Sequence, residues 1–363
     1  MRFVAEKDIL QKGLHSVQNA VASRSTLPIL SNILLETQNN TLQISATDLD
    51  VLGITTAATV KTIEEGSGTI PAKRISDIIK ELPNAEVVVT MKKNNMFTVE
   101  SGNSVFKIIG LPKEGFPQLP TPTHDNKTTI PQASLKRILQ RTTFAVSHDE
   151  TRYVLNGLYV SINGDTLHFV ATDGRRLALI EHTINTTTKI KTQAIIPSKT
   201  TTELLKTIKE EGDIEIYLEQ NQVFFKTNET TIISRLIEGE YPDYQQVLPK
   251  EKGERVVAEK EGFYSTMKRA SLLSTPESTA VKIELLKNKM VVSKTTPEIG
   301  EFRDELSVEY AGPTLTIGFN PNYLMDVLRV LEGETVEMEV VSAAKPALFK
   351  EERYLYLVLP MQI

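Results

Sequence analysis

Hydrophobic residues recur with a helical period in six segments of this chain, and these segments form three pairs. In each pair a first helix is followed by strand-like runs, a second helix and further strand-like runs. The stripe Leu10, Leu14, Val17 and Val21, for example, returns every three or four residues. The predicted first helices are 6–22, 132–145 and 259–273, and the predicted second helices are 72–82, 198–210 and 320–332. Because each pair spans a third of the chain, the repeat is a whole domain rather than a small solenoid unit.

Alternating apolar and polar residues between these helices predict antiparallel hairpins. The expected turns are Gln38-Asn39-Asn40, Asn163-Gly164 and Lys287-Asn288, of which Asn-Gly is the strongest hairpin signal. Helices on one face of antiparallel sheets form an α+β layer architecture. The sequence therefore predicts three tandem copies of a helix/antiparallel-sheet domain.

Proline-rich stretches mark the expected domain boundaries. One stretch covers residues 116–122, and a second covers residues 241–253. They divide the chain into predicted domains at 1–122, 123–252 and 253–363. With 363 residues and 40% hydrophobic residues, each third can bury a core of its own.

Composition excludes several classes of protein. The chain has no cysteine, so a disulfide framework, a thiol nucleophile and a cysteine-based metal site are excluded. The first residues lack the apolar run of a secretion signal, and no apolar stretch is long enough to cross a bilayer. We expect a cytoplasmic protein that has no membrane partner.

The formal net charge of −5 argues against nucleic acid, but the charge is unevenly distributed. The six predicted helices together carry +5, which leaves −10 on the rest of the chain. The helices could face a polyanion. Alternatively, lysine and arginine occur there because they are good helix formers on solvated faces. Charge alone does not choose between these interpretations.

No catalytic motif stands out. The five histidines lack metal-ligand spacing, and no phosphate loop, nucleophile elbow or HExxH motif occurs. Asp48 and Asp173 follow Ala-Thr at equivalent positions of the first two copies, and with Asp50 they could hold a divalent cation. A repeated Thr-Asp at a strand end fits an Asx-type turn better. We therefore expect neither catalytic residues nor a metal or other cofactor.

A different cluster suggests partner binding. The run Thr172-Asp173-Gly174-Arg175-Arg176-Leu177 joins a strand end to two arginines, and the chain finishes on the apolar run 357–363. That run could simply be the last edge strand of the third copy. Together with Tyr153, Pro242 and Tyr323 it could instead line an apolar groove between the second and third copies. Leucine and methionine side chains in such a groove can repack around varied peptides.

Seven segments, in this order and spacing, are similar to one known family. They are residues 26–30, 46–50, 116–117, 152–157, 171–178, 239–244 and 359–361. Over its full length the chain resembles the bacterial DNA polymerase III beta subunits, the beta sliding clamps. The resemblance implies a non-catalytic processivity factor. It also implies a head-to-tail homodimer that forms a ring of six domains with helices lining the hole.

The resemblance further implies the partners and the site residues. The partners are duplex DNA held without sequence preference, the polymerase III alpha subunit, the clamp loader complex, other DNA polymerases and repair proteins. The implied peptide groove is Arg152, Tyr153, Leu155, Thr172, Gly174, Arg175, Arg176, Leu177, Pro242, Val247, Tyr323, Leu359, Pro360 and Met361. The implied DNA-facing residues are Arg24, Lys73, Arg74, Lys136, Arg137, Arg141, His148, Lys199 and Lys206. The implied dimer seam contains Phe106, Lys107, Ile108, Leu272, Leu273, Glu298, Glu301 and Asp304.

Some positions depart from other members of the family. Arg175, Gln246 and Gln362 stand where some relatives have histidine, a basic residue and arginine, which affects the peptide preference expected of the groove. Asp149 stands where a relative has a neutral glutamine, which weakens the case for DNA contact by that loop. The main rival to the ring is a three-domain scaffold that uses the groove but never encircles DNA.

Overall fold

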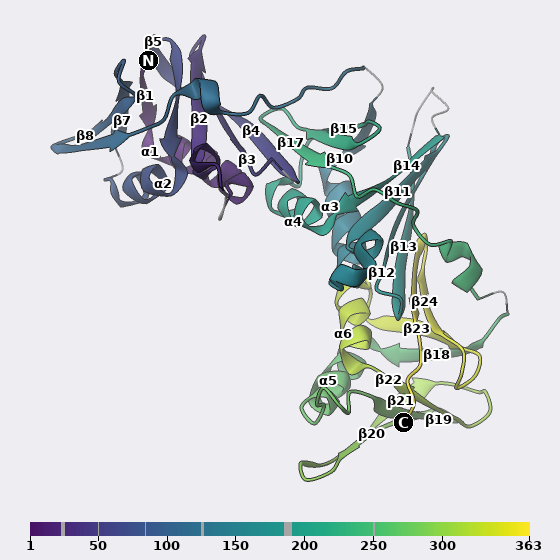
Figure 1. Ribbon diagram of the computed structural model, residues 1–363. Coiled ribbons are helices and arrows are strands. Elements are labelled where there is room, and N and C mark those ends of the chain that lie inside the picture. The colour runs from purple at the N-terminus through teal and green to yellow at the C-terminus, as the bar shows by residue number, and fades with distance from the viewer. Residues whose placement is uncertain (23–25, 50, 84, 125–126, 185–190, 250) are drawn as a thin grey trace. The chain divides into compact units, whose positions relative to one another are not determined.

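The computed structural model describes residues 1–22, 26–49, 51–83, 85–124, 127–184, 191–249 and 251–363 (Figure 1). In that part of the chain, no helix is both long and apolar enough to cross a membrane. The six predicted helices are confirmed, with shorter ends. They are α1 (Lys7–Val17), α2 (Ala72–Glu81), α3 (Gln132–Thr142), α4 (Ser198–Thr207), α5 (Lys260–Ser271) and α6 (Pro321–Val330).

The chain divides into two compact units. The first unit is Met1–Lys136 with Lys199–Leu236, and the second is Arg137–Ser198 with Ile237–Ile363. All ladders between named strands are antiparallel, and each sheet lies within a single unit. Both units therefore have the predicted layering of helices and antiparallel sheets.

The first unit contains two sheets. The strands of its five-stranded sheet are, in order, β5 (Lys61–Glu64), β1 (Arg2–Glu6), β7 (Glu86–Met91), β8 (Met96–Ser101) and β9 (Ser104–Ile109). Its eight-stranded sheet runs β10 (Thr128–Pro131), β15 (Asp213–Leu218), β16 (Gln222–Lys226), β17 (Thr230–Arg235), β4 (Leu52–Thr59), β3 (Thr41–Thr47), β2 (Asn32–Gln38) and β6 (Gly66–Pro71). The pairing of β17 with β4 joins strands of the second copy to strands of the first.

The second unit is built on twelve strands. Their order is β14 (Lys191–Pro197), β11 (Gly157–Asn163), β12 (Thr166–Thr172), β13 (Arg176–Thr183), β25 (Tyr354–Val358), β24 (Ala347–Glu351), β23 (Thr335–Val340), β18 (Glu254–Glu259), β21 (Gly300–Glu309), β20 (Lys289–Thr296), β19 (Val281–Leu286) and β22 (Leu315–Phe319). Here β13 pairs with β25, which joins the second copy to the third. Both connections between copies are thus continuous hydrogen-bonded ladders.

The three predicted hairpins are confirmed, and their turns explain the residues found there. Asn39 and Asn40 have φ angles of 47° and 59°, Gly164 has 67° and Asn288 has 55°. Positive φ is tolerated by glycine and asparagine and disfavoured for most other residues. These short turns fix the register of β2 with β3, β11 with β12 and β19 with β20.

Helices cover one face of the sheets and form the cores there. In Figure 1, α1 packs beside α2 and α5 packs beside α6. Gly13 lets α1 approach β3 closely, because a Cβ at this position would lie 2.8 Å from Ile44 Cδ1. Fully buried phenylalanines, among them Phe97 in the first unit and Phe349 in the second, are part of these cores. Removal of this apolar surface from water is the main stabilising contribution.

Candidate functional site

The 172–177 turn connects β12 to β13 and is fixed by its own side chains. The Thr172 hydroxyl donates to the Arg176 carbonyl at 2.5 Å and accepts from the Gly174 N–H at 3.0 Å. One carboxylate oxygen of Asp173 accepts the backbone N–H groups of Arg175 and Arg176 at 2.8 and 3.1 Å. The turn therefore holds its shape without a ligand.

Arg176 ties this turn to α6. Its Nε donates to Asp173 at 3.0 Å, its Nη1 donates to Asp326 at 2.6 Å, and its Nη2 donates to the Phe144 carbonyl at 2.6 Å. Its guanidinium carbon lies 4.4 Å from the centroid of the Tyr323 ring. Although burial opposes the charge, nearby Asp173 and Asp326 contribute to a pKa of Arg176 above its ordinary value. Arg176 therefore stays charged, and its guanidinium group packs against the Tyr323 ring.

Gly174 and Arg152 meet at the edge of the turn. Gly174 has a φ of 84°, and a Cβ at this position would lie 2.7 Å from Arg152 Nη1. Arg152 is also held by Asp149, whose Oδ2 accepts from its Nε at 3.1 Å. Hydrogen bonds from Thr151 and Arg152 lower the pKa of Asp149, so this carboxylate stays ionised. Asp149 therefore serves the fold of its loop, and Tyr153 beside it is 57% exposed.

The apolar end of the chain is tethered beside the turn. The Leu359 N–H donates to the Arg175 carbonyl at 2.9 Å, and the Met361 N–H donates to the Gly318 carbonyl at 2.8 Å. Gly318 is required at this close approach, because a Cβ there would lie 2.5 Å from the Met361 carbonyl. The last residues therefore continue past β25 as an ordered rim.

The floor beside the turn is apolar. Leu177 is buried with Val170, Leu348 and Leu357, and segment 241–248 packs against this cluster through Tyr241, Tyr244 and Leu248. Pro242 is exposed and Val247 is 51% exposed on the same segment. These contacts connect six of the predicted groove residues, and Pro242 and Val247 flank them. The six are Arg152, Gly174, Arg175, Arg176, Tyr323 and Leu359.

Sequence analysis overlooked the residues that hold the site from behind. Asp326 and Phe144 bind the Arg176 guanidinium, and the Tyr356 hydroxyl donates to the Tyr323 carbonyl at 2.9 Å. Asp326 lies three residues after Tyr323, on the same side of α6. That spacing was a usable signal. The role of Phe144 could not be predicted from the sequence, since every residue has a backbone carbonyl.

The predicted DNA-facing cations are mostly accessible. Lys73 and Arg74 are exposed on α2, and Arg137 and His148 are exposed in or after α3. The Nζ of Lys136 is hydrogen bonded to Glu210 and that of Lys199 to Asp48, while the Nζ of Lys206 lies 3.2 Å from Glu203. Arg24 lies outside the described residues.

Arg141 requires a correction, because it does not lie on an open helix face. Its side chain is only 4% exposed, forms an ion pair with Glu351 and lies over the Tyr354 ring at 4.2 Å. A buried arginine persists where a carboxylate and an aromatic face compensate its lost hydration. Arg141 therefore holds α3 against β24 and β25 and is not free to contact a ligand.

The predicted seam residues lie at two strand edges. On β9, Phe106 is 39% exposed, Lys107 is exposed and Ile108 is buried. After α5, Leu272 is 78% exposed. Only Val308 and Glu309 of β21 pair with β18, so residues 300–307 pair with β20 on one side only.

The acidic residues of that second edge differ from one another. Glu298 and Glu301 are exposed. Asp304 is hydrogen bonded to Arg269 and Thr266, and Glu305 is hydrogen bonded to Lys289 and Arg303. These bonds lower the pKa of both carboxyls. Asp304 and Glu305 therefore already have partners within the chain.

Asp48, one of the three aspartates considered for a cation, forms a turn at the end of β3. Asp48 Oδ1 accepts the N–H groups of Val51 and Leu52 at 3.0 and 2.8 Å, and its Oδ2 accepts from Lys199. Burial alone would raise the pKa of Asp48, but these bonds lower it. Among the described residues, no group of three or more potential ligands could hold a metal ion. Asp48 thus forms the Asx-type turn, and Asp50 lies outside the described residues.

Comparisons with known proteins agree along the whole chain. Family models of the DNA polymerase III beta subunit match residues 1–120 (N-terminal domain), 129–243 (central domain) and 245–362 (C-terminal domain). The beta sliding clamps of Pseudomonas putida and Escherichia coli K12 are 33% and 32% identical, with 100% of both chains covered.

Solved structures give the same result. The DNA polymerase sliding clamp from Bacillus subtilis is 29% identical, with a TM-score of 0.95 over 100% of this chain and 99% of that one. The DNA polymerase III subunit beta from Pseudomonas aeruginosa is 32% identical, with a TM-score of 0.95 over 100% of both chains. The chain is thus similar to these proteins in sequence and in fold.

Proposed function

Since this chain belongs to the DNA polymerase III beta subunit family, we propose that two copies close head to tail into a ring around duplex DNA. The protein is a DNA sliding clamp, a non-catalytic processivity factor built from three tandem clamp domains. Family boundaries support domains near our predicted limits of 122 and 252. We place its work in the cytoplasm, where replication proteins of bacteria act.

We assign DNA contact to the DNA-facing residues that the resemblance implies, except the buried Arg141. Arg24, Lys73, Arg74, Arg137, His148, Lys199 and Lys206 would contact phosphates, with Lys136 beside them. Several of these side chains already have a carboxylate partner, which weakens their electrostatic attraction to phosphate. Weak, sequence-independent attraction suits a ring that must slide, because strong phosphate contacts would hold it in place.

We assign partner binding to the anchored 172–177 turn and its surroundings. The observation that carries this assignment is Arg176, which three hydrogen bonds fix beneath the Tyr323 ring. A preformed site loses little conformational entropy when a peptide binds. Short glutamine- and leucine-containing peptides of the polymerase III alpha subunit, the clamp loader, other DNA polymerases and repair proteins would share it in turn.

We assign the dimer seam to the two free strand edges. β9 of one copy would pair with residues 300–307 of β21 in the other, which extends two sheets into one and covers exposed Phe106 and Leu272. Glu298 and Glu301 remain available for Lys107. Both proposed edges carry exposed apolar side chains, a common mark of an interface.

Changing Leu272→Ala together with Leu273→Ala tests the seam. We expect the dimer dissociation constant to rise at least about tenfold, because buried apolar contacts are lost. Sedimentation at nanomolar concentration would measure it, with Lys252→Ala, outside the proposed seam, as the matched control. An unchanged sedimenting mass would count against the seam.

Loading on nicked circular DNA tests the whole proposal. The protein is loaded by a matching loader, half of the sample is linearised, and both halves pass through a sizing column in moderately high salt. Retention on circles with loss from linear DNA supports a sliding ring. Equal loss would favour the scaffold that never encircles DNA, and equal retention would indicate ordinary phosphate binding.

A further inference from the structure

A cavity of about 700 Å³ lies beside segment 241–245, outside the residues predicted for the partner groove except Pro242. Its walls come from β11, β12, β14 and this segment. Tyr159 and Ser161 of β11 line it, together with Ile162 and Asn163 at the end of the strand, whereas Leu158 and Val160 are buried in the core. Side chains of a strand point alternately to opposite faces. The cavity is therefore on the face of the sheet opposite to that core.

The cavity shares a residue with the proposed partner groove. Pro242 belongs to both, since it lines the cavity and flanks the groove. Tyr241 and Tyr244, which also line the cavity, pack against the cluster that contains Leu177. A peptide that leaves the groove across segment 241–245 would meet the cavity next.

Aromatic rings dominate the chemistry of the cavity. The Tyr159 and Tyr241 rings are stacked with centroids 4.8 Å apart, and the Tyr244 ring lies 6.1 Å from that of Tyr159. Burial raises the pKa of all three phenols, so they stay neutral at physiological pH. The Tyr159 hydroxyl donates to the Gln193 side-chain oxygen at 2.8 Å, which leaves the Gln193 amide N–H groups to face a ligand.

Charge does not select a ligand here. Lys191 and Asp243 place one charge of each sign at the cavity, and His168 lies 3.7 Å from Glu181. Flat rings beside neutral amide and hydroxyl donors suit an extended chain with exposed carbonyls. Proline-containing segments present such carbonyls in a preformed extended helix and dock on aromatic-lined grooves.

We propose that this cavity is an extension of the partner groove and receives a proline-containing, extended segment that flanks the groove-binding motif of a partner. The proposal rests on the proposed function of the groove. A partner peptide would then be bound at two places, the 172–177 turn and the cluster of Tyr159, Tyr241 and Tyr244.

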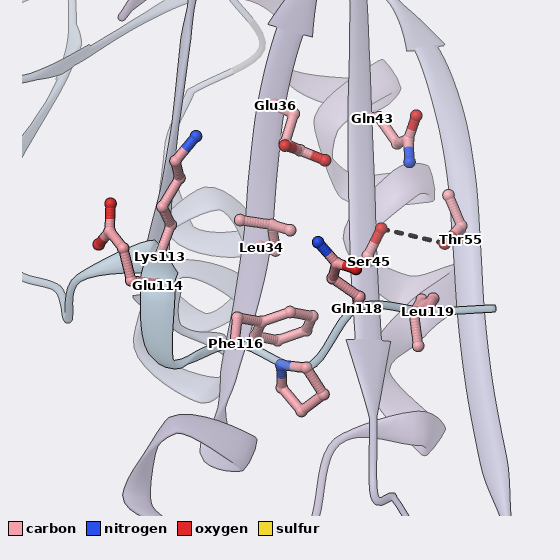
Figure 2. Close-up of a pocket in the computed structure, with 11 residues that line it drawn as sticks. Leu34, Glu36, Gln43, Ser45, Thr55, Lys113, Glu114, Phe116, Gln118 and Leu119 are labelled. Atoms are coloured by element: carbon pink, nitrogen blue, oxygen red, sulfur yellow. Dashed lines mark hydrogen bonds between the residues drawn. The ribbon is translucent and has the colours of Figure 1, made fainter.

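The first copy provides a natural control for this proposal. A cavity of about 460 Å³ lies at the equivalent place. Figure 2 shows segment 113–119 crossing β2, β3 and β4 there. Leu34 is the third residue of β2 as Tyr159 is of β11, and Phe116-Pro117 corresponds to Tyr241-Pro242. Glu36 and Gln43 line this cavity, and Ser45 is hydrogen bonded to Thr55. It lacks a cluster of tyrosines, and we expect no docking there.

Binding of fluorescent peptides to the full-length protein tests the proposal. One probe carries only a glutamine- and leucine-containing motif, and two others extend it with a proline-containing segment at either end. We expect one extended probe to bind about tenfold tighter than the short one, the effect of an added aromatic contact. Replacing its prolines with glycine should remove the gain.

Two variants locate the gain. Tyr159→Leu, which copies the first domain, and Ser161→Arg, which fills the cavity and spares the tyrosines, should each abolish it. The reverse change Leu34→Tyr should leave all affinities unchanged. A gain that survives Ser161→Arg, or no gain for either extended probe, would overturn the proposal. Failure of every probe to bind, the short one included, would instead overturn the proposed groove.

Discussion

The turn at 47–52 in the first copy and the turn at 172–177 in the second have similar hydrogen bonds but different neighbours. The first is one residue longer, because the Thr47 hydroxyl donates to the Leu52 carbonyl and the Thr172 hydroxyl to the Arg176 carbonyl. In both, a threonine hydroxyl accepts an N–H two residues on and an aspartate accepts two further N–H groups. In the first, Lys199 reaches the aspartate from α4, and Leu52, the first residue of β4, stands where the second turn has Arg176, the first residue of β13. The turn is thus a structural device that was repeated, and the arginine converts one copy of it into a binding site.

The two turns also differ at their left-handed residue. Leu49 has a φ of 67° and its counterpart Gly174 has 84°. Leucine in this conformation is strained. At the second turn, the absence of a Cβ makes room for the guanidinium of Arg152. The glycine therefore serves the approach of a neighbour, since the first turn has a leucine in the same left-handed region.

Removal of the arginine should produce the largest difference between the turns. Arg176→Ala leaves Asp173 and Asp326 without their shared partner in a largely buried place, so we expect a loss of about 3 to 5 kcal/mol. Lys199→Ala removes a half-exposed partner from Asp48 and should cost less than about 1 kcal/mol. Urea unfolding followed by circular dichroism compares the two variants.

The same arginine variant should lose the peptide. Asp326→Asn separates the two effects, because it retains the shape of the side chain but weakens its hold on Arg176. We expect the short groove peptide to bind about tenfold more weakly to Asp326→Asn, a loss near that of one charged hydrogen bond. If the Asp326→Asn and Lys199→Ala variants bound the short groove peptide equally well, the second turn would have no special role in peptide binding.

Exchange of the left-handed residues should give an intermediate effect. Gly174→Leu strains the backbone and displaces Arg152, for an expected loss of about 1 to 2 kcal/mol. Leu49→Gly relieves strain but frees the unfolded chain, so its stability should change by less than about 0.5 kcal/mol. Thermal unfolding of both variants gives the comparison, and equal losses would contradict it.

A fall in pH, which removes the stabilising contribution of ionised Asp48, should have the smallest effect on stability. The pKa of Asp48 lies below its ordinary value of 3.8 in the folded protein, so its ionised form stabilises the fold above that pH. This contribution is lost as pH falls below about 4 and toward the lowered pKa. We expect the gap in melting temperature between the wild type and Asp48→Asn to narrow between pH 7 and pH 3. A gap that widened would reverse the sign we assign.

Local patterns were enough to predict the elements of this fold. Stripes such as Leu10 and Leu14 located the helices, and Asn-Gly located a hairpin, because both signals lie within a few residues of what they specify. The strand neighbours β17 and β4 were beyond this reach. Alternation tells which face of a strand is buried but not which strand lies beside it.

The site shows the same limit. The groove residues came from a resemblance to a family and not from periodicity. Arg141 lies at the edge of an apolar stripe, where a helical pattern cannot distinguish a buried from an exposed arginine. Its partner Glu351 is 210 residues away in the sequence, so only the tertiary structure could reveal the pairing.

The ladder between β17 and β4 determines where the chain can be cut. A fragment that stopped at the predicted boundary near residue 122 would carry β4 without β17, so an unpaired strand edge would face water. Leu119 would also lose its contact with the cluster of Tyr217, Phe224 and Ile233. Such a fragment should aggregate when expressed alone. The repeated segment of sequence, about a third of the chain, is therefore smaller than the smallest segment that we expect to fold alone.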